Sequence, residues 1–105
     1  MKLLSRSEEL VLLAVLTLKE HAYCVPIRKK LKETTGKSWS FGSIYDPLDR
    51  LVHRGFLKSF LSEPTKERGG RSKRIYRLTE EGKKALIEIR NIEKALWAEV
   101  TGFEI

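Results

Sequence analysis

Apolar side chains dominate residues 10–18, where Thr17 alone interrupts the run. Ser5 and Glu8 precede this run with the Ser-x-x-Glu spacing of a capping box, so a first helix is predicted over residues 6–19. Because that helix is hydrophobic almost all round, we expect it to be buried on more than one side. One of those sides could face a second subunit. The alternative is a central core helix with no partner role.

A second helical pattern follows a short polar break. Pro26 suits the first turn of a helix, where its missing N–H costs no hydrogen bond, and the helix is predicted to end near Thr34. The side chains expected to point inward are Val25, Ile27 and Leu31. The outer face carries the basic residues Arg28, Lys29, Lys30 and Lys32. We expect this to be an ordinary solvated face with one or two residues near a phosphate backbone. The alternative is a scaffold helix that contacts phosphates.

The next pattern predicts a third, shorter helix. Ile44, Leu48 and Leu51 are separated by four and three residues, which places them on one helical face, and Gly55 ends the helix. The opposite face carries Ser43, Tyr45, Asp49, Arg50 and Arg54. Pro47 would clash with a preceding carbonyl beyond the first turn. The helix is therefore expected either to begin near Ser43 or to kink at Pro47.

Two aromatic residues lie next to the turn between the second and third helices. Trp39 and Phe41 lie on either side of Ser40, just after the turn at residues 34–38. We expect both to be core side chains. An aromatic wedge inserted into DNA is the alternative.

Two extended runs, residues 56–61 and 73–78, follow the third helix and predict a β-hairpin. Pro64 and the pair Gly69 and Gly70 punctuate the tip between them, which excludes a helix there. Residues 64–77 contain one acidic residue, Glu67, and the basic residues Lys66, Arg68, Arg71, Lys73, Arg74 and Arg77. A short helix followed by a basic hairpin is the layout of a winged helix-turn-helix. Its helix can enter a major groove, and its tip can lie along phosphates or in a minor groove.

A long amphipathic pattern ends the chain. Thr79 is placed to cap a helix over residues 80–100, and the acidic Glu80 and Glu81 suit its first turn. At 1.5 Å per residue the helix would be roughly 30 Å long, longer than a small core can cover. Its apolar stripe comprises Leu86, Ile89, Ile92, Leu96 and Val100, with Trp97 beside it and Phe103 at its end.

This stripe predicts a two-fold dimer, the commonest assembly of soluble proteins. Leu10 and Leu13 of the first helix are expected to join the interface. The alternative is that the last helix folds back on its own domain. The fold class expected is mainly α with a small β-hairpin: a winged helix-turn-helix domain over residues 1–79 and a dimerisation helix over residues 80–105, within one compact unit.

Composition and charge narrow the class of protein. A chain of 105 residues fits one domain, and 41% hydrophobic with 33% charged residues is typical of a folded globular protein. The net charge of +7 favours a polyanionic partner, most often nucleic acid. The longest apolar run is too short to span a bilayer, and acidic residues precede it, unlike in a signal peptide. We therefore expect a cytoplasmic protein with no membrane role.

No catalytic or metal-binding constellation is evident. Cys24 is the sole cysteine and is expected to be a buried structural thiol, while His21 and His53 lie far apart, so no zinc-site spacing exists. Asp46 and Asp49 lie one helical turn apart, a spacing that could serve acid–base chemistry. Ion pairing with the adjacent Arg50 is the ordinary explanation. We expect neither an enzyme nor a cofactor.

Four stretches together resemble the PadR family of transcriptional regulators. They are residues 42–51 (GSIYDPLDRL), 55–57 (GFL), 69–71 (GGR) and 75–82 (IYRLTEEG), and the likeness extends from about Leu10 to the end. The resemblance implies winged-helix dimers that pair through the C-terminal helix with help from the N-terminal one. It also implies that some members respond to phenolic acids or lipophilic compounds, and that some use an aromatic-lined space between protomers. Trp97 could line such a space or be an interface aromatic without a ligand.

The expected function is that of a homodimeric, sequence-specific DNA-binding transcriptional regulator, most simply a repressor, on a palindromic operator. The helix residues expected to approach double-stranded DNA are Ser43, Tyr45, Asp49 and Arg50. The wing residues expected at phosphates are Lys66, Arg68, Arg71 and Lys73, with Gly69 and Gly70 allowing close backbone approach. Tyr45 packed in the core and a merely solvated wing are the opposing interpretation. Alternative functions are an architectural or RNA-binding winged helix of low sequence specificity, and a protein-interaction subunit that docks through its last helix.

Overall fold

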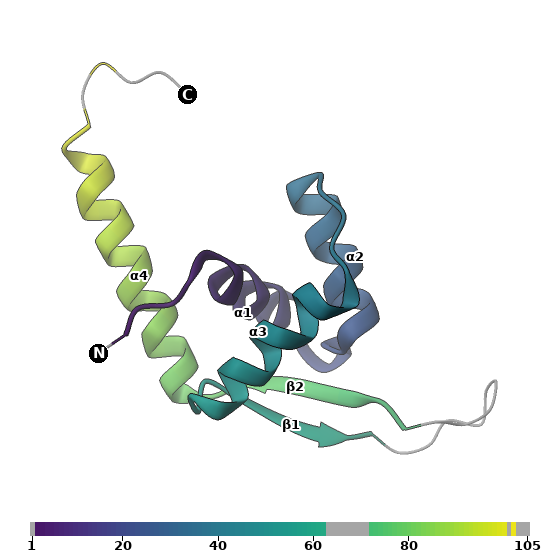
Figure 1. Cartoon of the computed structure of the whole chain (residues 1–105). Helices are drawn as coiled ribbons and strands as arrows, with labels where there is room; N and C mark the ends of the chain where they lie inside the picture. Colours follow the sequence, from purple (N-terminus) through teal and green to yellow (C-terminus); the bar gives the residue numbers. More distant parts are fainter. Residues whose placement is uncertain (1, 63–71, 101, 103–105) are drawn as a thin grey trace.

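The computed structural model describes residues 2–62, 72–100 and 102. Within these residues the chain forms four α-helices, a 3-10 turn and a two-stranded hairpin (Figure 1). In chain order they are α1 (Arg6–Leu18), η1 (Lys19–His21), α2 (Cys24–Thr35), α3 (Phe41–His53), β1 (Leu57–Leu61), β2 (Arg74–Leu78) and α4 (Glu80–Ala98). This arrangement confirms the predicted winged helix-turn-helix with a long C-terminal helix.

The core lies where α1, α2, α3 and the hairpin meet. Ile44, Leu48 and Leu51 of α3 are completely buried there, which confirms the predicted inner face. On α2 the inner face is Cys24, Ile27 and Leu31, one helical stripe, whereas Val25 is 59% exposed. The inward orientation predicted for Val25 was wrong. Because α2 begins at Cys24, the thiol occupies the core position, as expected for a structural cysteine, and the next side chain turns outward.

Helix α1 carries the capping box that its sequence predicts. Ser5 Oγ accepts a hydrogen bond from the Glu8 amide at 3.2 Å, and Glu8 Oε1 accepts one from the Ser5 amide at 2.8 Å. The helix ends at Leu18, one residue earlier than predicted, and continues as the 3-10 turn. Leu13 and Leu16 remain 41% and 46% exposed, so one side of this apolar helix stays open.

Helix α3 begins at Phe41, two residues before the predicted start. Ser40 caps it by accepting a hydrogen bond from the Ser43 amide at 3.1 Å. Pro47 therefore lies beyond the first turn, and a start near Ser43 was wrong. The proline ring is buried in the core, and the helix continues through it to His53. Burial of the ring offsets the backbone hydrogen bond that proline removes.

The two strands form an antiparallel pair in which Leu57 faces Leu78 and Leu61 faces Arg74. The buried side chains of the hairpin are Leu57 and Tyr76, and the Tyr76 amide donates to the Ala22 carbonyl at 2.9 Å. These contacts hold the base of the hairpin against the helical body. Figure 1 shows the hairpin extending from the base of α4 toward the far side of the molecule.

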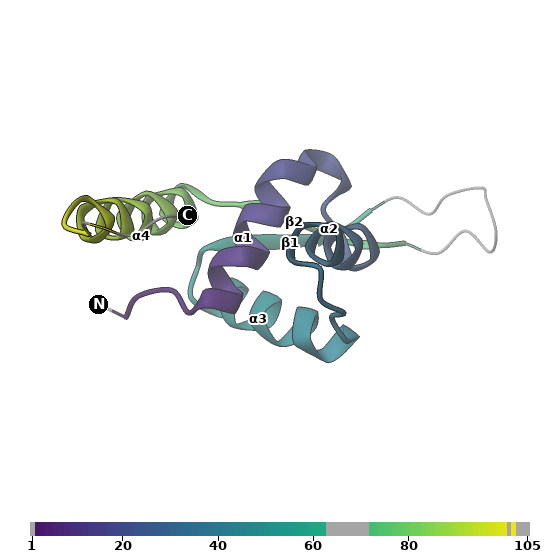
Figure 2. The same ribbon diagram turned by 90° about the horizontal axis from the view of Figure 1, so that it is seen from above.

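Helix α4 leaves the helical body and has few neighbours in its second half (Figures 1 and 2). Thr79 caps it by accepting a hydrogen bond from the Gly82 amide at 3.0 Å, as predicted. The same hydroxyl donates to the Gly55 carbonyl at 2.7 Å, which joins the end of the hairpin to the end of α3. The helix ends at Ala98, two residues before the predicted boundary. None of the helices in the described part of the chain is long and apolar enough to cross a membrane.

Candidate nucleic-acid interface

The outer face of α3 presents polar side chains to solvent. Ser43, Tyr45, Asp49 and Arg50, the residues predicted to approach DNA, are all exposed, while the opposite face of the same helix is buried. Tyr45 is 44% exposed, so it is not packed in the core. Hydrogen bonding to the Cys24 thiol, followed by the electrostatic influence of that group, raises the pKa of Tyr45.

Arg50 and Arg54 both turn toward Glu8 at the start of α1. Arg50 Nε lies 3.6 Å from Glu8 Oε2, and Arg54 Nη1 lies 2.9 Å from Glu8 Oε1. Arg54 also donates to the Lys2 carbonyl, and its guanidinium lies 4.8 Å from the centre of the Phe56 ring. The Arg54 side chain is only 21% exposed, so its predicted place on the free outer face was wrong.

Glu8 was not predicted as part of the site. Burial raises the pKa of this carboxyl, but hydrogen bonds from the Ser5 amide and from Arg54 outweigh that effect, and its pKa is lowered. In the sequence, the capping box alone explains why a glutamate stands at position 8. Its ion pairs with Arg50 and Arg54 could not be predicted from that pattern. The ion pair of Arg50 recorded in the described structure is with Glu8, so the expected pairing of Asp49 with Arg50 was wrong.

Phe41 begins α3 and is half exposed, contrary to the predicted core position. The Arg28 guanidinium lies 4.7 Å from the centre of its ring, and Arg28 Nε donates to the Trp39 carbonyl. Trp39 packs against the core as predicted, and its Nε1 donates to Thr35 Oγ1 at 3.1 Å. The first buried side chain of α3 is Ile44, so Phe41 lies on a turn that extends beyond the core.

The base of the wing, which comprises β1, β2 and the residues between them, is basic and well anchored. Lys73 Nζ lies 4.3 Å from the centre of the Tyr23 ring and 3.2 Å from its hydroxyl oxygen. Arg74 donates to Ser59 Oγ at 3.0 Å, and Arg77 lies 5.4 Å from the Phe60 ring centre. Tyr23, a partner that sequence reasoning missed, holds Lys73 at the edge of α2. The remaining predicted wing residues, Lys66, Arg68, Gly69, Gly70 and Arg71, lie outside the described residues.

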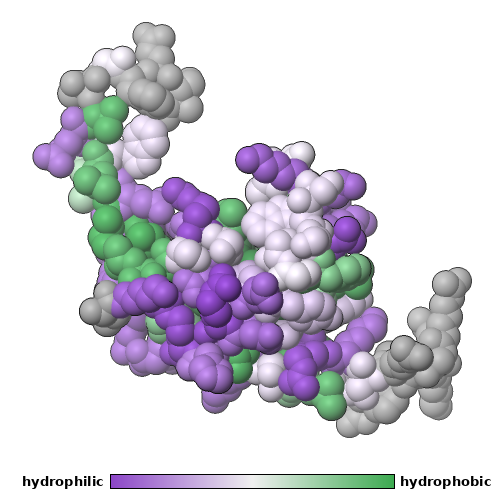
Figure 3. Space-filling model, viewed as in Figure 1, coloured by the Kyte–Doolittle hydropathy of each residue, from purple (hydrophilic) through white to green (hydrophobic). Residues whose placement is uncertain are grey.

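The residues predicted for dimerisation separate into two groups. Leu86 is buried against its own domain, and Leu10 and Ile89 are half-buried. The exposed group comprises Leu13, Ile92, Leu96, Trp97 and Val100. Figure 3 shows hydrophobic side chains gathered along α4. The second half of α4 therefore carries an apolar surface that its own domain does not cover.

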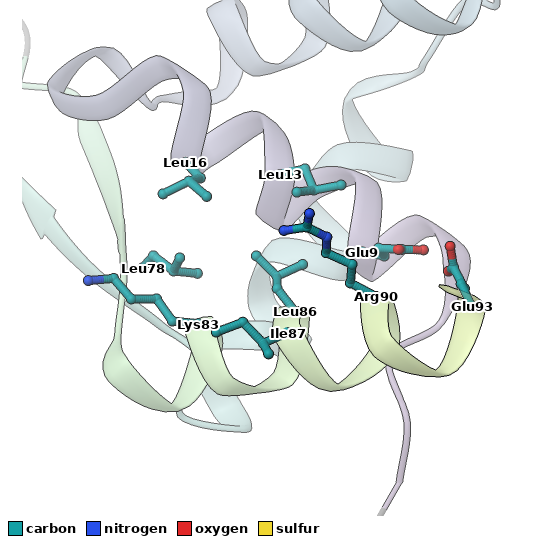
Figure 4. Close-up of a pocket in the computed structure, with 9 residues that line it drawn as sticks. All are labelled: Glu9, Leu13, Leu16, Leu78, Lys83, Leu86, Ile87, Arg90 and Glu93. Atoms are coloured by element: carbon teal, nitrogen blue, oxygen red, sulfur yellow. The ribbon is translucent and has the colours of Figure 1, made fainter. Parts of the chain in front are cut away.

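A groove of about 370 Å³ lies between α1 and α4. Leu13 and Leu16 face Leu86 across it, and Glu9 and Glu93 lie at one end (Figure 4). Arg6 Nη1 lies 3.3 Å from Glu9 and 3.9 Å from Glu93. Burial and the neighbouring Glu93 raise the pKa of Glu9. Trp97, which could line an effector space or be an interface aromatic without a ligand, does not line this groove.

Comparison with known proteins identifies relatives of the same architecture. Residues 12–88 match the transcriptional regulator PadR-like family. No curated protein matches the sequence. A PadR-like transcription factor from Bacteroides fragilis is 32% identical, with a TM-score of 0.68 over 87% of this chain and 85% of that one. A PadR family transcription regulator from Clostridium difficile is 28% identical, with a TM-score of 0.61 over 86% of this chain and 91% of that one. A chain from the complex structure of hsRosR-S4 is 27% identical in sequence, with a TM-score of 0.63 over 95% of this chain and 77% of that one.

Proposed function

The chain belongs to the PadR-like family of transcriptional regulators, and from this premise we propose that it is a homodimeric repressor that binds a palindromic operator. Members of this family are DNA-binding regulators of transcription, not enzymes. The observation that carries the proposal is the division of α3 into a completely buried face and an exposed polar one. A helix held in this way can enter a major groove without disturbing the core.

The side chains on the outer face of α3 have the chemistry to distinguish base pairs. Arg50 is half exposed and can donate two hydrogen bonds to a guanine, or one to a phosphate. Asp49 can accept from a cytosine amino group, and Ser43 can contact either kind of base edge. Tyr45, 44% exposed, extends the same face. These four residues are proposed to specify the sequence.

The wing is proposed to position the protein on the phosphate backbone, which carries no sequence information by itself. Lys73 is held at the base of the wing by Tyr23. The other cations proposed to contact phosphates are Lys66, Arg68 and Arg71, while Gly69 and Gly70 would allow the backbone to approach closely. Each phosphate contact adds about one unit to the dependence of log affinity on log salt concentration.

A second copy of the chain is proposed to cover the exposed half of α4. Leu96 is 61% exposed, Trp97 52% and Val100 46%, a concentration of large apolar side chains that favours burial against a partner. Leu13 of α1 lies open as well and is proposed to join this interface. A two-fold pairing would place two copies of α3 on successive half-sites, so the operator would be a palindrome. A small lipophilic or phenolic effector bound between protomers near Trp97 is part of the proposal.

Selection of bound duplexes from random DNA tests the proposed function. The expected product is a palindromic consensus whose half-sites lie about one helical turn apart. Arg50→Ala should relax the preference at one base pair of each half-site if this arginine reads a base, at a cost of about 1–3 kcal/mol. Equal weakening on all sequences would make Arg50 a phosphate contact. Enrichment without any consensus would instead indicate an architectural protein and would overturn the proposal.

A further inference from the structure

An exposed, anchored aromatic ring stands at the start of the helix proposed to enter DNA. Phe41 is the first residue of α3, immediately after the cap Ser40, and half of its surface is open to solvent. Covering such a ring with a partner would contribute favourable free energy of burial. The ring is therefore a candidate contact that the polar residues farther along α3 do not explain.

The ring is also held in place. The Arg28 guanidinium lies 4.7 Å from its centre, and Arg28 is itself fixed because its Nε donates to the Trp39 carbonyl. The Phe41 ring is thus held against a cation whose own position is fixed by a backbone hydrogen bond. A ring that is already oriented loses little conformational freedom on binding.

We infer that Phe41 packs against the 5-methyl group of a thymine and is a specificity-determining residue for the operator, an inference that rests on the proposed function. The major groove offers one apolar group among its base edges, the thymine methyl, and aromatic side chains are among its partners. The N-terminal residues of a recognition helix are the ones that contact base edges. Arg28, beside the ring, is a positioning residue and lies where a neighbouring phosphate would balance its charge.

The inference is tested by exchanging thymine for deoxyuridine, a change that removes the methyl group and leaves every hydrogen-bonding atom in place. The probe is the duplex obtained by selection, with each thymine of one half-site replaced in turn. For the wild-type protein, one replacement should weaken binding about fourfold, the value expected for losing one buried methyl group. The other replacements should leave the affinity unchanged. Wild-type binding that is insensitive at every thymine would overturn the inference without requiring any variant.

Variants then identify the side chain responsible. Phe41→Ala should bind the thymine duplex at least about fourfold more weakly than wild type and should no longer distinguish thymine from deoxyuridine. The matched control is Phe60→Ala on β1, which removes a similarly exposed ring that also lies beside an arginine, Arg77 of β2. The control should keep the full sensitivity to deoxyuridine.

The remaining outcomes separate this inference from the proposed function. If Phe41→Ala weakens binding to both duplexes and keeps the discrimination, the ring contacts the backbone or another residue reads the methyl group, and the inference fails. If a consensus is obtained but no thymine in it is coupled to Phe41, the inference fails while the proposed function stands. If no consensus can be selected, the proposed function fails and the inference with it.

Discussion

Arg54 at the end of α3 donates a hydrogen bond to Glu8 on α1, with 2.9 Å between Nη1 and Oε1. The same carboxylate oxygen accepts the Ser5 amide at 2.8 Å, and its other oxygen lies 3.6 Å from Arg50 Nε. One buried carboxylate thus caps α1 and holds the last turns of α3. This link therefore helps to fix the orientation of α3 relative to α1.

Replacing Glu8 with glutamine should destabilise the protein at neutral pH. Glu8→Gln keeps the shape of the side chain but leaves Arg54 without its charged partner in a largely buried place. We expect a loss of about 1–3 kcal/mol in the free energy of unfolding, measured by urea denaturation. Because the pKa of Glu8 is lowered in the folded state, the difference from wild type should shrink as the pH falls below 4.5 and through that lowered value.

The control for this change is Glu33→Gln, at an exposed position on α2. Its effect should stay within about 0.5 kcal/mol. An equally small effect of Glu8→Gln would mean that the Glu8 link does not stabilise the fold.

Replacing the adjacent Glu9 with glutamine should stabilise the protein at neutral pH, the opposite of the effect expected for Glu8. Burial and Glu93 raise its pKa, so the folded protein resists ionisation of this carboxyl, and its ionisation costs stability above the ordinary value of 4.5. Glu9→Gln removes that cost, and the lost contact with Arg6 matters little because Arg6 is mostly exposed. The variant should therefore melt at a higher temperature than wild type at pH 7, and the gain should disappear as the pH falls below 4.5. A lower melting temperature at pH 7 would contradict this account.

Gly82 should tolerate no side chain. A Cβ atom there would lie 2.3 Å from the Phe56 carbonyl oxygen and 2.7 Å from Leu78 Cδ1, and the backbone oxygen cannot move aside. Gly82→Ala should cost about 1–3 kcal/mol in thermal or urea unfolding. Gly42, also helical, offers the matched control, since its nearest neighbour would be Ser40 Oγ at 3.9 Å. Gly42→Ala should be neutral or stabilise by up to about 1 kcal/mol, and equal effects at both glycines would refute the packing argument.

A charge placed on the open half of α4 should separate the proposed dimer. Leu96→Glu would bury a carboxylate against apolar side chains of the second copy, so monomers are expected by light scattering. Lys94→Glu changes charge on another side of the same helix, because two residues correspond to a rotation of about 200°. This control should remain dimeric. Dimers that persist in Leu96→Glu would place the interface on another surface.

Much of the fold follows from spacing in the sequence. Ile44, Leu48 and Leu51 specify the buried face of α3, and both predicted caps, Ser5 and Thr79, are present. The boundaries differ where a local interaction decides them. Because Ser40 caps α3, the helix begins at Phe41, two residues earlier than predicted. Pro47 is tolerated inside the helix because its ring is buried.

The candidate site was harder to predict because its important contacts join segments distant in sequence. Arg54 pairs with Glu8 and Lys73 with Tyr23, and no local pattern reveals such pairs. The exposure of Phe41 depends on where the core ends relative to α3, which is a property of the packed helices. The chemistry of the outer face of α3 was evident from helical periodicity alone.

Fluorescence anisotropy over a salt series, with the selected operator and a shuffled duplex, tests most directly whether this chain is a sequence-specific regulator. We predict a preference for the operator of about a thousandfold or more at physiological salt. Affinity for both duplexes should fall steeply as salt increases, because the wing and the rest of the basic surface displace counterions from phosphates. Equal affinity for the two duplexes, or no binding at low salt, would contradict the account.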